Sequence, residues 1–298
     1  MVMKRRSLSL LCFIFGVGFT GCSDSTGPGS LSDRWILFTG QAALDPGSPV
    51  IYAIRPDGTG LRKVTSGLGQ ALYPRWSRDG NQIAYVTMGS DLIYQVWVMK
   101  RDESGAHSIA AASGCSTALT RLSWSPSGDR IVADCYLTDE FVINVADKTS
   151  YSLAGRWGRV ANDPDWSPSA DKILHSSGSS TYVANLDGSG VSLFASLAAE
   201  PAWSPDGRRV AFVSNGGNQP HALFVANADG SGVNQLTFPA SIYITDQWPA
   251  WSHDGTQIVY ARGDESNRTL WALHVIRPDG SGDKVITPDT LLATKADW

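Results

Sequence analysis

The chain has 298 residues, of which 42% are hydrophobic and 17% are charged. This composition excludes a disordered or coiled-coil chain and is sufficient for the core of one large all-β domain. The formal net charge is −4, and no basic run follows residue 6. Nucleic-acid-binding surfaces need clustered Lys and Arg, so these features exclude a nucleic-acid partner.

Residues 1–21 are predicted to be a signal peptide. Basic residues at 4–6 precede an apolar stretch over 8–19, which is shorter than the ~20 apolar residues that cross a bilayer. The ending Phe19-Thr20-Gly21-Cys22 resembles a bacterial lipobox. That resemblance implies that Cys22 is lipidated and becomes the new N-terminus. The alternative is an ordinary secreted protein in which this cysteine is unmodified.

Residues 22–32 are polar and are predicted to form a flexible tether after the lipidated Cys22. The next residue, Ser23, is not the Asp that retains many lipoproteins at the inner membrane. By this resemblance the protein is expected on the periplasmic face of the outer membrane. The tether enters on the side of the turns that join the first and second strands, and the third and fourth strands, of each repeat described below. That side is therefore expected to face the membrane.

A Trp-Ser phrase recurs along residues 33–298 and is followed each time by a turn and a short apolar strand. In Trp203-Ser204-Pro205-Asp206-Gly207, Pro presets φ for a turn and Gly takes the left-handed position that closes it. The repeated tryptophans are spaced by 37 to 48 residues and are Trp76, Trp124, Trp166, Trp203, Trp251 and Trp298. They are interpreted as packing between repeats; a row of sugar-stacking platforms is the alternative.

An Asp-Gly phrase alternates with the first and separates two further strands, as at Asp57-Gly58 and Asp229-Gly230. Asp-Gly between apolar runs is a strong hairpin signal. Each unit of about 40–45 residues therefore predicts four antiparallel strands, A to D, which is the period of a β-propeller. The Asp-Gly-Ser-Gly loops lack the additional carboxylates of a calcium loop and are interpreted as turns.

The two ends of the repeat region complete one blade. Residues 34–40 have the pattern of a B strand without an A strand before it, and residues 294–298 have the pattern of an A strand without a B strand after it. The predicted fold is therefore all-β: a six-bladed β-propeller of four-stranded antiparallel blades over residues 33–298. It is expected to close by pairing the N-terminal strands (34–65) with the C-terminal strand (294–298), which leaves no open sheet edge at the junction.

These repeats resemble the WD-repeat-like propeller repeats of the TolB type, which occur in TolB and in many bacterial lipoproteins. The resemblance rests on the Trp-Ser-Pro-Asp-Gly and Asp-Gly-Ser-Gly phrases and covers nearly all of residues 33–298. It includes neither the N-terminal domain of TolB nor the hydrolase domain of prolyl-oligopeptidase-like enzymes. It implies the fold and leaves the function open, because propellers host both binding and catalysis.

Cys115 and Cys135 remain after removal of the signal peptide and are expected in an oxidising compartment, where a disulfide is allowed. Cys135 is predicted to lie opposite Leu119, so a bridge requires the chain before Leu119 to fold back. Two unpaired thiols are the alternative.

The sequence contains none of the common catalytic or metal-binding motifs: no G-x-S-x-G, no H-E-x-x-H and no C-x-x-C. The five histidines are scattered over different repeats, with His175 and His274 expected on strands and His253 in a turn. No catalytic residue, metal site or cofactor is predicted.

The irregular B–C and D–A loops are the predicted binding face, because variable loops on a rigid scaffold commonly carry function. Their Arg and aromatic residues suit protein recognition. The candidate contacts are Tyr73, Arg75, Arg156, Trp157, Arg159, His221, Tyr243, Asp246, Trp248 and Arg262.

The favoured function is that of a monomeric, non-catalytic envelope lipoprotein that binds a protein, a peptide or a glycan and is held at the membrane by its lipid alone. The alternative is a lyase or hydrolase acting on a polysaccharide, or a glycan binder, with its site in the central channel. Arg75, Asp165 and Asp297 could reach that channel or pair with each other.

Overall fold

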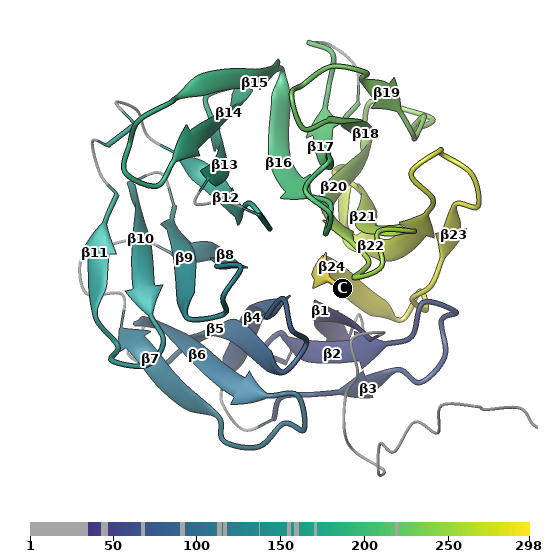
Figure 1. Cartoon of the computed structure of the whole chain (residues 1–298). Helices are drawn as coiled ribbons and strands as arrows, with labels where there is room; N and C mark the ends of the chain where they lie inside the picture. Colours follow the sequence, from purple (N-terminus) through teal and green to yellow (C-terminus); the bar gives the residue numbers. More distant parts are fainter. Residues whose placement is uncertain are drawn as a thin grey trace, which may run out of the picture.

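A computed structural model describes residues 35–42, 47–66, 69–89, 93–111, 115, 118–136, 138–153, 156–157, 161–169, 172–217 and 220–298. In these residues 24 strands form six four-stranded sheets around a central axis (Figure 1). The predicted six-bladed β-propeller is confirmed. The predicted signal peptide, Cys22, the tether and Arg159 lie outside the described residues. Among the residues that are described, no helix has the length and apolarity needed to cross a membrane.

Blade 1 contains β24 (Leu291–Asp297), β1 (Ile36–Ala42), β2 (Val50–Ile54) and β3 (Arg62–Lys63). Blade 2 contains β4 (Gln70–Trp76), β5 (Gln82–Met88), β6 (Tyr94–Lys100) and β7 (His107–Ala111). Blade 3 contains β8 (Leu119–Trp124), β9 (Arg130–Cys135), β10 (Asp139–Asn144) and β11 (Ser150–Ser152).

Blade 4 contains β12 (Asn162–Trp166), β13 (Lys172–Ser177), β14 (Ser180–Asn185) and β15 (Ser192–Ser196). Blade 5 contains β16 (Ala198–Trp203), β17 (Arg209–Ser214), β18 (Ala222–Asn227) and β19 (Asn234–Gln235). Blade 6 contains β20 (Ile244–Trp251), β21 (Ile258–Asp264), β22 (Asn267–Ile276) and β23 (Lys284–Val285).

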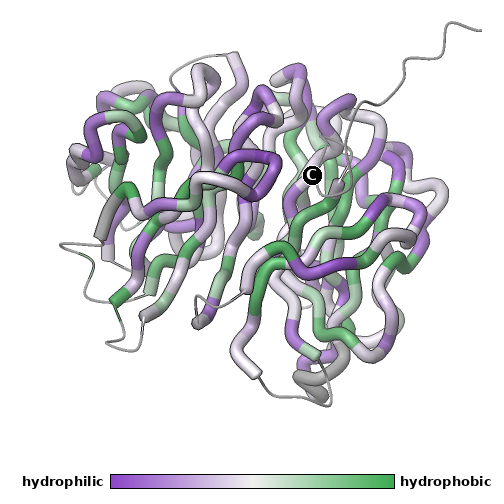
Figure 2. The backbone as a smooth tube through the Cα atoms, turned by 90° about the horizontal axis from the view of Figure 1, so that it is seen from below, coloured by the Kyte–Doolittle hydropathy of each residue, from purple (hydrophilic) through white to green (hydrophobic). Residues whose placement is uncertain are grey.

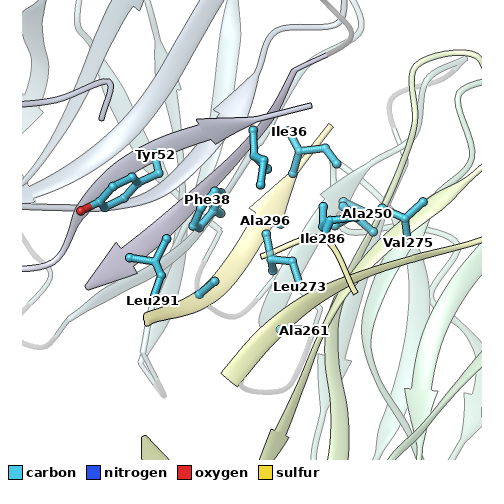
Figure 3. Packing of buried hydrophobic residues seen from close by; sticks show 13 residues of the cluster. Ile36, Phe38, Tyr52, Ala250, Ala261, Leu273, Val275, Ile286, Leu291 and Ala296 are labelled. Carbon is cyan, nitrogen blue, oxygen red and sulfur yellow. The ribbon is translucent and has the colours of Figure 1, made fainter. Parts of the chain in front are cut away.

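The ring closes by pairing of β1 with β24, the first and last strands. Thr39 lies opposite Thr294 and Gly40 opposite Ala293. A buried apolar cluster that includes Phe38 of blade 1 and Leu273 of blade 6 joins these neighbouring blades (Figure 3). Closure is thus stabilised both by backbone hydrogen bonds and by apolar burial, as the patterns at the two ends of the repeats predicted.

Burial follows the repeat pattern. The strands carry the hydrophobic residues and the connecting turns carry most of the hydrophilic ones (Figure 2). Five of the repeated tryptophans are buried and Trp298 is half-buried. The indole Nε1 of Trp124 donates to the carbonyl of Arg75 at 3.1 Å, and that of Trp251 donates to the carbonyl of Ala202 at 3.1 Å. Both bonds link adjacent blades, so these tryptophans pack between repeats.

The Asp-Gly loops close on themselves. In the loop after β18, Asp229 Oδ1 accepts hydrogen bonds from the backbone N and the hydroxyl of Ser231, at 2.9 and 2.6 Å. These bonds lower the pKa of Asp229. A turn closed by these bonds accounts for both the Asp229 carboxylate and the Ser231 hydroxyl.

Cys115 and Cys135 form a disulfide, with their Cα atoms 5.6 Å apart. Leu119 lies opposite Cys135 in the β8–β9 ladder, as predicted. The chain before Leu119 therefore returns to β9, which is the condition that a bridge required.

Candidate functional site

Two cavities lie along the central channel. The larger has a volume of about 560 Å³ and lies at the end that carries the A–B turns; we call it the wide mouth. The smaller has a volume of about 290 Å³ and lies at the other end of the inner strands; we call it the narrow mouth. Arg75 and Arg121 line both cavities, so their side chains form the partition between them.

Acidic side chains in the wide mouth connect neighbouring blades. Asp297 accepts a hydrogen bond from the backbone N of Trp76 at 2.7 Å, and Asp165 accepts one from that of Trp203 at 2.6 Å. Arg75 lies 3.4 Å from Asp297. The sequence left open whether Arg75, Asp165 and Asp297 reach the channel or pair with each other; all three line it, and Arg75 pairs with Asp297.

The narrow mouth is built from one repeated position, three residues before each repeated tryptophan. Each inner strand has a register shift near this position. Five of the six residues adopt left-handed φ values of 53° or 54°. Residues other than Gly seldom adopt this conformation, and it costs about 1–3 kcal/mol at each position. One comes from each blade, and we call them the inner ring: Tyr73, Arg121, Asp163, Glu200, Trp248 and Lys295.

In the half of the narrow mouth nearest blades 1, 2, 5 and 6, the charged side chains form hydrogen bonds within the inner ring. Lys295 Nζ donates to Tyr73 Oη at 2.7 Å and lies 5.3 Å from the centre of the Trp248 ring. Burial lowers the pKa of Lys295 to about 8. Glu200 Oε2 accepts from the backbone N of Trp248 at 2.6 Å, and burial raises the pKa of Glu200 to about 7. This half contains a lysine and a carboxyl group that both titrate near neutral pH.

The half formed by blades 3 and 4 is acidic. Arg121, Asp134 and Glu140 are successive partners across β8, β9 and β10, so their side chains project from the same face of blade 3. Asp134 and Glu140 are 1% and 2% exposed. Burial raises the pKa of Asp134 to about 7 and that of Glu140 well above its usual value. Asn162 and Asp163 of β12 complete this wall.

The structure separates the predicted contact residues into three groups. Tyr73, Arg75 and Trp248 line the narrow mouth. His221, Tyr243, Asp246 and Arg262 lie between blades 5 and 6, where the backbone N of Asp246 donates to the carbonyl of His221 at 2.9 Å and Arg262 Nε donates to Asp246 at 2.6 Å. Arg156 and Trp157 lie beside the Asp-Gly turn of blade 4, away from both groups.

Two of the predicted contact residues are buried. Trp157 is 5% exposed, its Nε1 donates to the carbonyl of Asn185, and its ring stacks on His175 with centroids 4.5 Å apart. Asp246 is fully buried and holds Arg262. Neither side chain is available to a partner.

Most of the inner ring escaped the sequence reasoning, which considered mainly the residues one and two positions before each tryptophan. The missed members are Arg121, Asp163, Glu200 and Lys295, together with Asp134 on the adjacent strand. Four of the six inner strands have the form x-Pro-x-Trp with a polar or aromatic residue first, at Tyr73, Asp163, Glu200 and Trp248. That position was a readable signal for the ring; nothing in the sequence marks Asp134.

Known structures share the fold of this chain. No protein-family model matches the chain, and no curated protein matches it. TolB from Acinetobacter baumannii superposes with a TM-score of 0.75 at 18% identity, over 91% of this chain and 68% of that one. A chain of a nidogen/laminin complex superposes at 0.65 with 9% identity, over 88% and 97% of the two chains.

An oligogalacturonate lyase in complex with manganese superposes with a TM-score of 0.54 at 16% identity, over 86% of this chain and 74% of that one. Identities this low establish a shared fold, and the fold of this chain is that of the TolB-type propeller. Within the part of the chain that the structure describes, no three His, Cys, Asp or Glu side chains are grouped so as to hold a metal ion.

Proposed function

We propose that this chain is a protein-binding β-propeller of the bacterial cell envelope and that its partner binds over the narrow mouth. The loop over residues 238–243 carries the proposal. It exposes Phe238 by 77%, Ile242 by 64% and Tyr243 by 55%. Apolar side chains exposed together in this way are characteristic of interaction surfaces.

This loop stands beside the inner ring. It leads into β20, which begins at Ile244 and carries Trp248 of the ring. Four residues of strand span about 13 Å. A partner that covers the loop can therefore also reach the mouth of the channel.

The base of the loop is held in place by backbone hydrogen bonds. The backbone N of Ile244 donates to the carbonyl of Ser241 at 3.1 Å, and that of Glu265 donates to the carbonyl of Tyr243 at 2.8 Å. Little conformational entropy remains to be lost there on binding, which favours affinity. The surrounding aromatic side chains and Arg262 suit a protein partner, because such residues dominate binding energy in interfaces.

The envelope location rests on the sequence. The segment 1–21 has the features of a signal peptide, and Cys22 follows a lipobox-like ending. We propose a monomer lipidated at Cys22 and held at the periplasmic face of the outer membrane. Trp35, the first described residue, accepts a hydrogen bond from the Trp76 indole, and Trp76 lines the wide mouth. In this arrangement the wide mouth faces the membrane and the narrow mouth faces away from it.

The proposal is tested by cross-linking and pull-down of the intact lipoprotein from cells. The test variant is F238S/I242S/Y243S. The control variant is L193S/V233S/V285S, whose residues are exposed by 56%, 56% and 47% on outer strands and turns. We expect a discrete protein partner that the wild type and the control capture and the test variant loses. A partner retained by the test variant, or no partner for any form, would refute the proposal.

Lys295 supports a second candidate, a lyase acting on an acidic polysaccharide. A lyase needs a base to remove the proton next to a carboxylate, and a lysine with a pKa of about 8 beside the Tyr73 hydroxyl can serve. The test is the ultraviolet absorbance of unsaturated product from oligogalacturonate, with Lys295→Met as the inactive variant. Absence of product with the wild type would refute this candidate.

A further inference from the structure

Unsatisfied polar atoms are concentrated in the wall of the narrow mouth formed by blades 3 and 4. Asp134 Oδ1, both carboxyl oxygens of Glu140 and Asn162 Oδ1 are buried and have no hydrogen-bond partner among the described residues. Buried polar groups are nearly always paired, and each unpaired one costs about 1–3 kcal/mol. Asp134 and Asn162 line the cavity, so their two unpaired acceptors, beside Nη1 of Arg121, which also has no hydrogen bond, indicate a site that is completed by a ligand.

Acceptors outnumber donors in this wall. The Thr120 hydroxyl donates to Asp134 Oδ2 at 2.5 Å, and hydrogen bonding from the backbone of Asp163 also lowers the pKa of Asp134, while Oδ1 has no close partner. The nearby cation is Arg121, whose Nη1 lies 3.8 Å from Asp163 and whose Nη2 donates to the carbonyl of Pro201 at 3.1 Å. One guanidinium therefore faces two carboxyl groups, those of Asp134 and Asp163.

The cavity in front of this wall suits an organic cation. Its volume of about 290 Å³ exceeds what a bare ion needs, and the described residues present no group arranged to hold a metal. Aromatic rings of Tyr73, Tyr136 and Trp248 line the same cavity. Aromatic faces attract ammonium and guanidinium groups. Lys295 already uses this attraction, since its Nζ lies 3.9 Å from the centre of the Tyr73 ring.

We propose that the wall formed by Asp134, Asn162 and Asp163, with Tyr136 at its rim, binds an organic cation of the guanidinium or alkylammonium class. The cation donates to Asp134 Oδ1 and Asn162 Oδ1 and is attracted by the charge of Asp163. Its source is a basic side chain of a protein partner or a free amine. With the first source the inference rests on the proposed function; with the second it stands apart from it.

Binding of the cation is linked to protons. Burial raises the pKa of Asp134 to about 7, with charge repulsion from Asp163 adding to the rise and the Thr120 hydrogen bond, the Asp163 backbone and Arg121 opposing it. A bound cation favours the carboxylate, so binding releases a proton and strengthens as pH rises. Asp139 directly precedes Glu140 in β10, and its charge also raises the pKa of Glu140.

The test is isothermal titration of the mature protein with three probes. Acetyl-Gly-Arg-Gly-amide carries the cation, the same tripeptide with citrulline is its neutral isostere, and agmatine is a free guanidinium amine. We expect the arginine tripeptide to bind at least ~10-fold more tightly than the citrulline tripeptide. Titration in buffers of different ionisation enthalpy should show proton release. Tighter binding of the tripeptide than of agmatine identifies a protein-borne cation, and the reverse identifies a free amine.

Asp134→Asn and Asp163→Asn should each reduce arginine binding at least ~10-fold. Asp289→Asn, at an exposed aspartate before β24, is the matched control. Equal binding of the arginine and citrulline tripeptides, unchanged binding in both wall variants, or no binding of arginine tripeptide and agmatine would overturn the inference. Failure here together with a captured partner in the pull-down removes this site and leaves the proposed function intact.

Discussion

The Asp134→Asn variant should make the protein more resistant to unfolding at alkaline pH. Burial raises the pKa of Asp134 from 3.8 to about 7 in the folded state. The folded protein therefore keeps a proton that the unfolded chain has released, and this stabilisation is complete below about pH 4 and is lost as pH rises through about 7. Asn has the shape of the protonated side chain and no charge to bury, so the variant avoids that loss.

The size of the effect follows from the same rise in pKa. Each pKa unit corresponds to about 1.4 kcal/mol, so the whole rise gives roughly 4 kcal/mol as an upper limit. Between about pH 5 and about pH 8 the free energy of unfolding of the variant should gain about 2–3 kcal/mol relative to the wild type. Glu200 titrates in both proteins. Besides burial, charge repulsion from Asp134 raises the pKa of Glu140, so the difference between the two proteins reports Asp134 together with its coupling to Glu140.

Urea unfolding at several pH values, followed by tryptophan fluorescence, measures this difference. Asp289→Asn is the control, because its side chain is exposed and a surface substitution should change stability by no more than about 0.5 kcal/mol at any pH. A wild type and an Asp134→Asn variant with parallel stability curves from about pH 5 to about pH 8 would refute the account of a carboxyl group whose pKa is raised by burial.

Three further changes probe the architecture. Phe38→Ala empties a fully buried site between blades 1 and 6. It should cost about 3–5 kcal/mol of unfolding free energy and lower the Tm measured by calorimetry by roughly 10 °C. A Tm within a degree or so of wild type would contradict close packing at the ring closure. Replacing Cys115 and Cys135 by Ser opens a crosslink with a sequence separation of 20 and should cost about 3 kcal/mol in urea, with no further effect of reductant. Arg262→Met leaves Asp246 buried without its charged partner and should cost about 3–5 kcal/mol; stability equal to wild type would contradict a structural role for this ion pair.

The repeat pattern determined the architecture because it is local. Trp203-Ser204-Pro205-Asp206-Gly207 specifies a turn by the φ preferences of Pro and Gly, and the Asp-Gly loops do the same through self-contained hydrogen bonds such as that of Asp229. Periodic repetition of these turns gave the number of blades, the strand order and closure by residues 34–40 and 294–298. The blade count and the strand order need no knowledge of which distant residues meet, and closure needs only that the two ends supply the missing strands of one blade.

The buried or exposed state of individual loop residues could not be read in this way. Trp157 and Asp246 have the composition of contact residues, yet both are buried, because blade packing covers the first and Arg262 neutralises the second. The disulfide likewise depended on the return of the chain before Leu119, which the local pattern left open.

The sequence by itself thus determined the blades, since strand period and turn chemistry act over a few neighbouring residues. Tertiary structure alone decided the chemistry of the channel. Ring closure brings Tyr73, Asp163 and Lys295 from separate blades into one cavity and turns them inward through left-handed backbone conformations. It also buries Asp134 beside Glu140. Burial then raises the pKa values of Asp134 and Glu140 and lowers that of Lys295, and burial depends on packing in space that no spacing along the chain encodes.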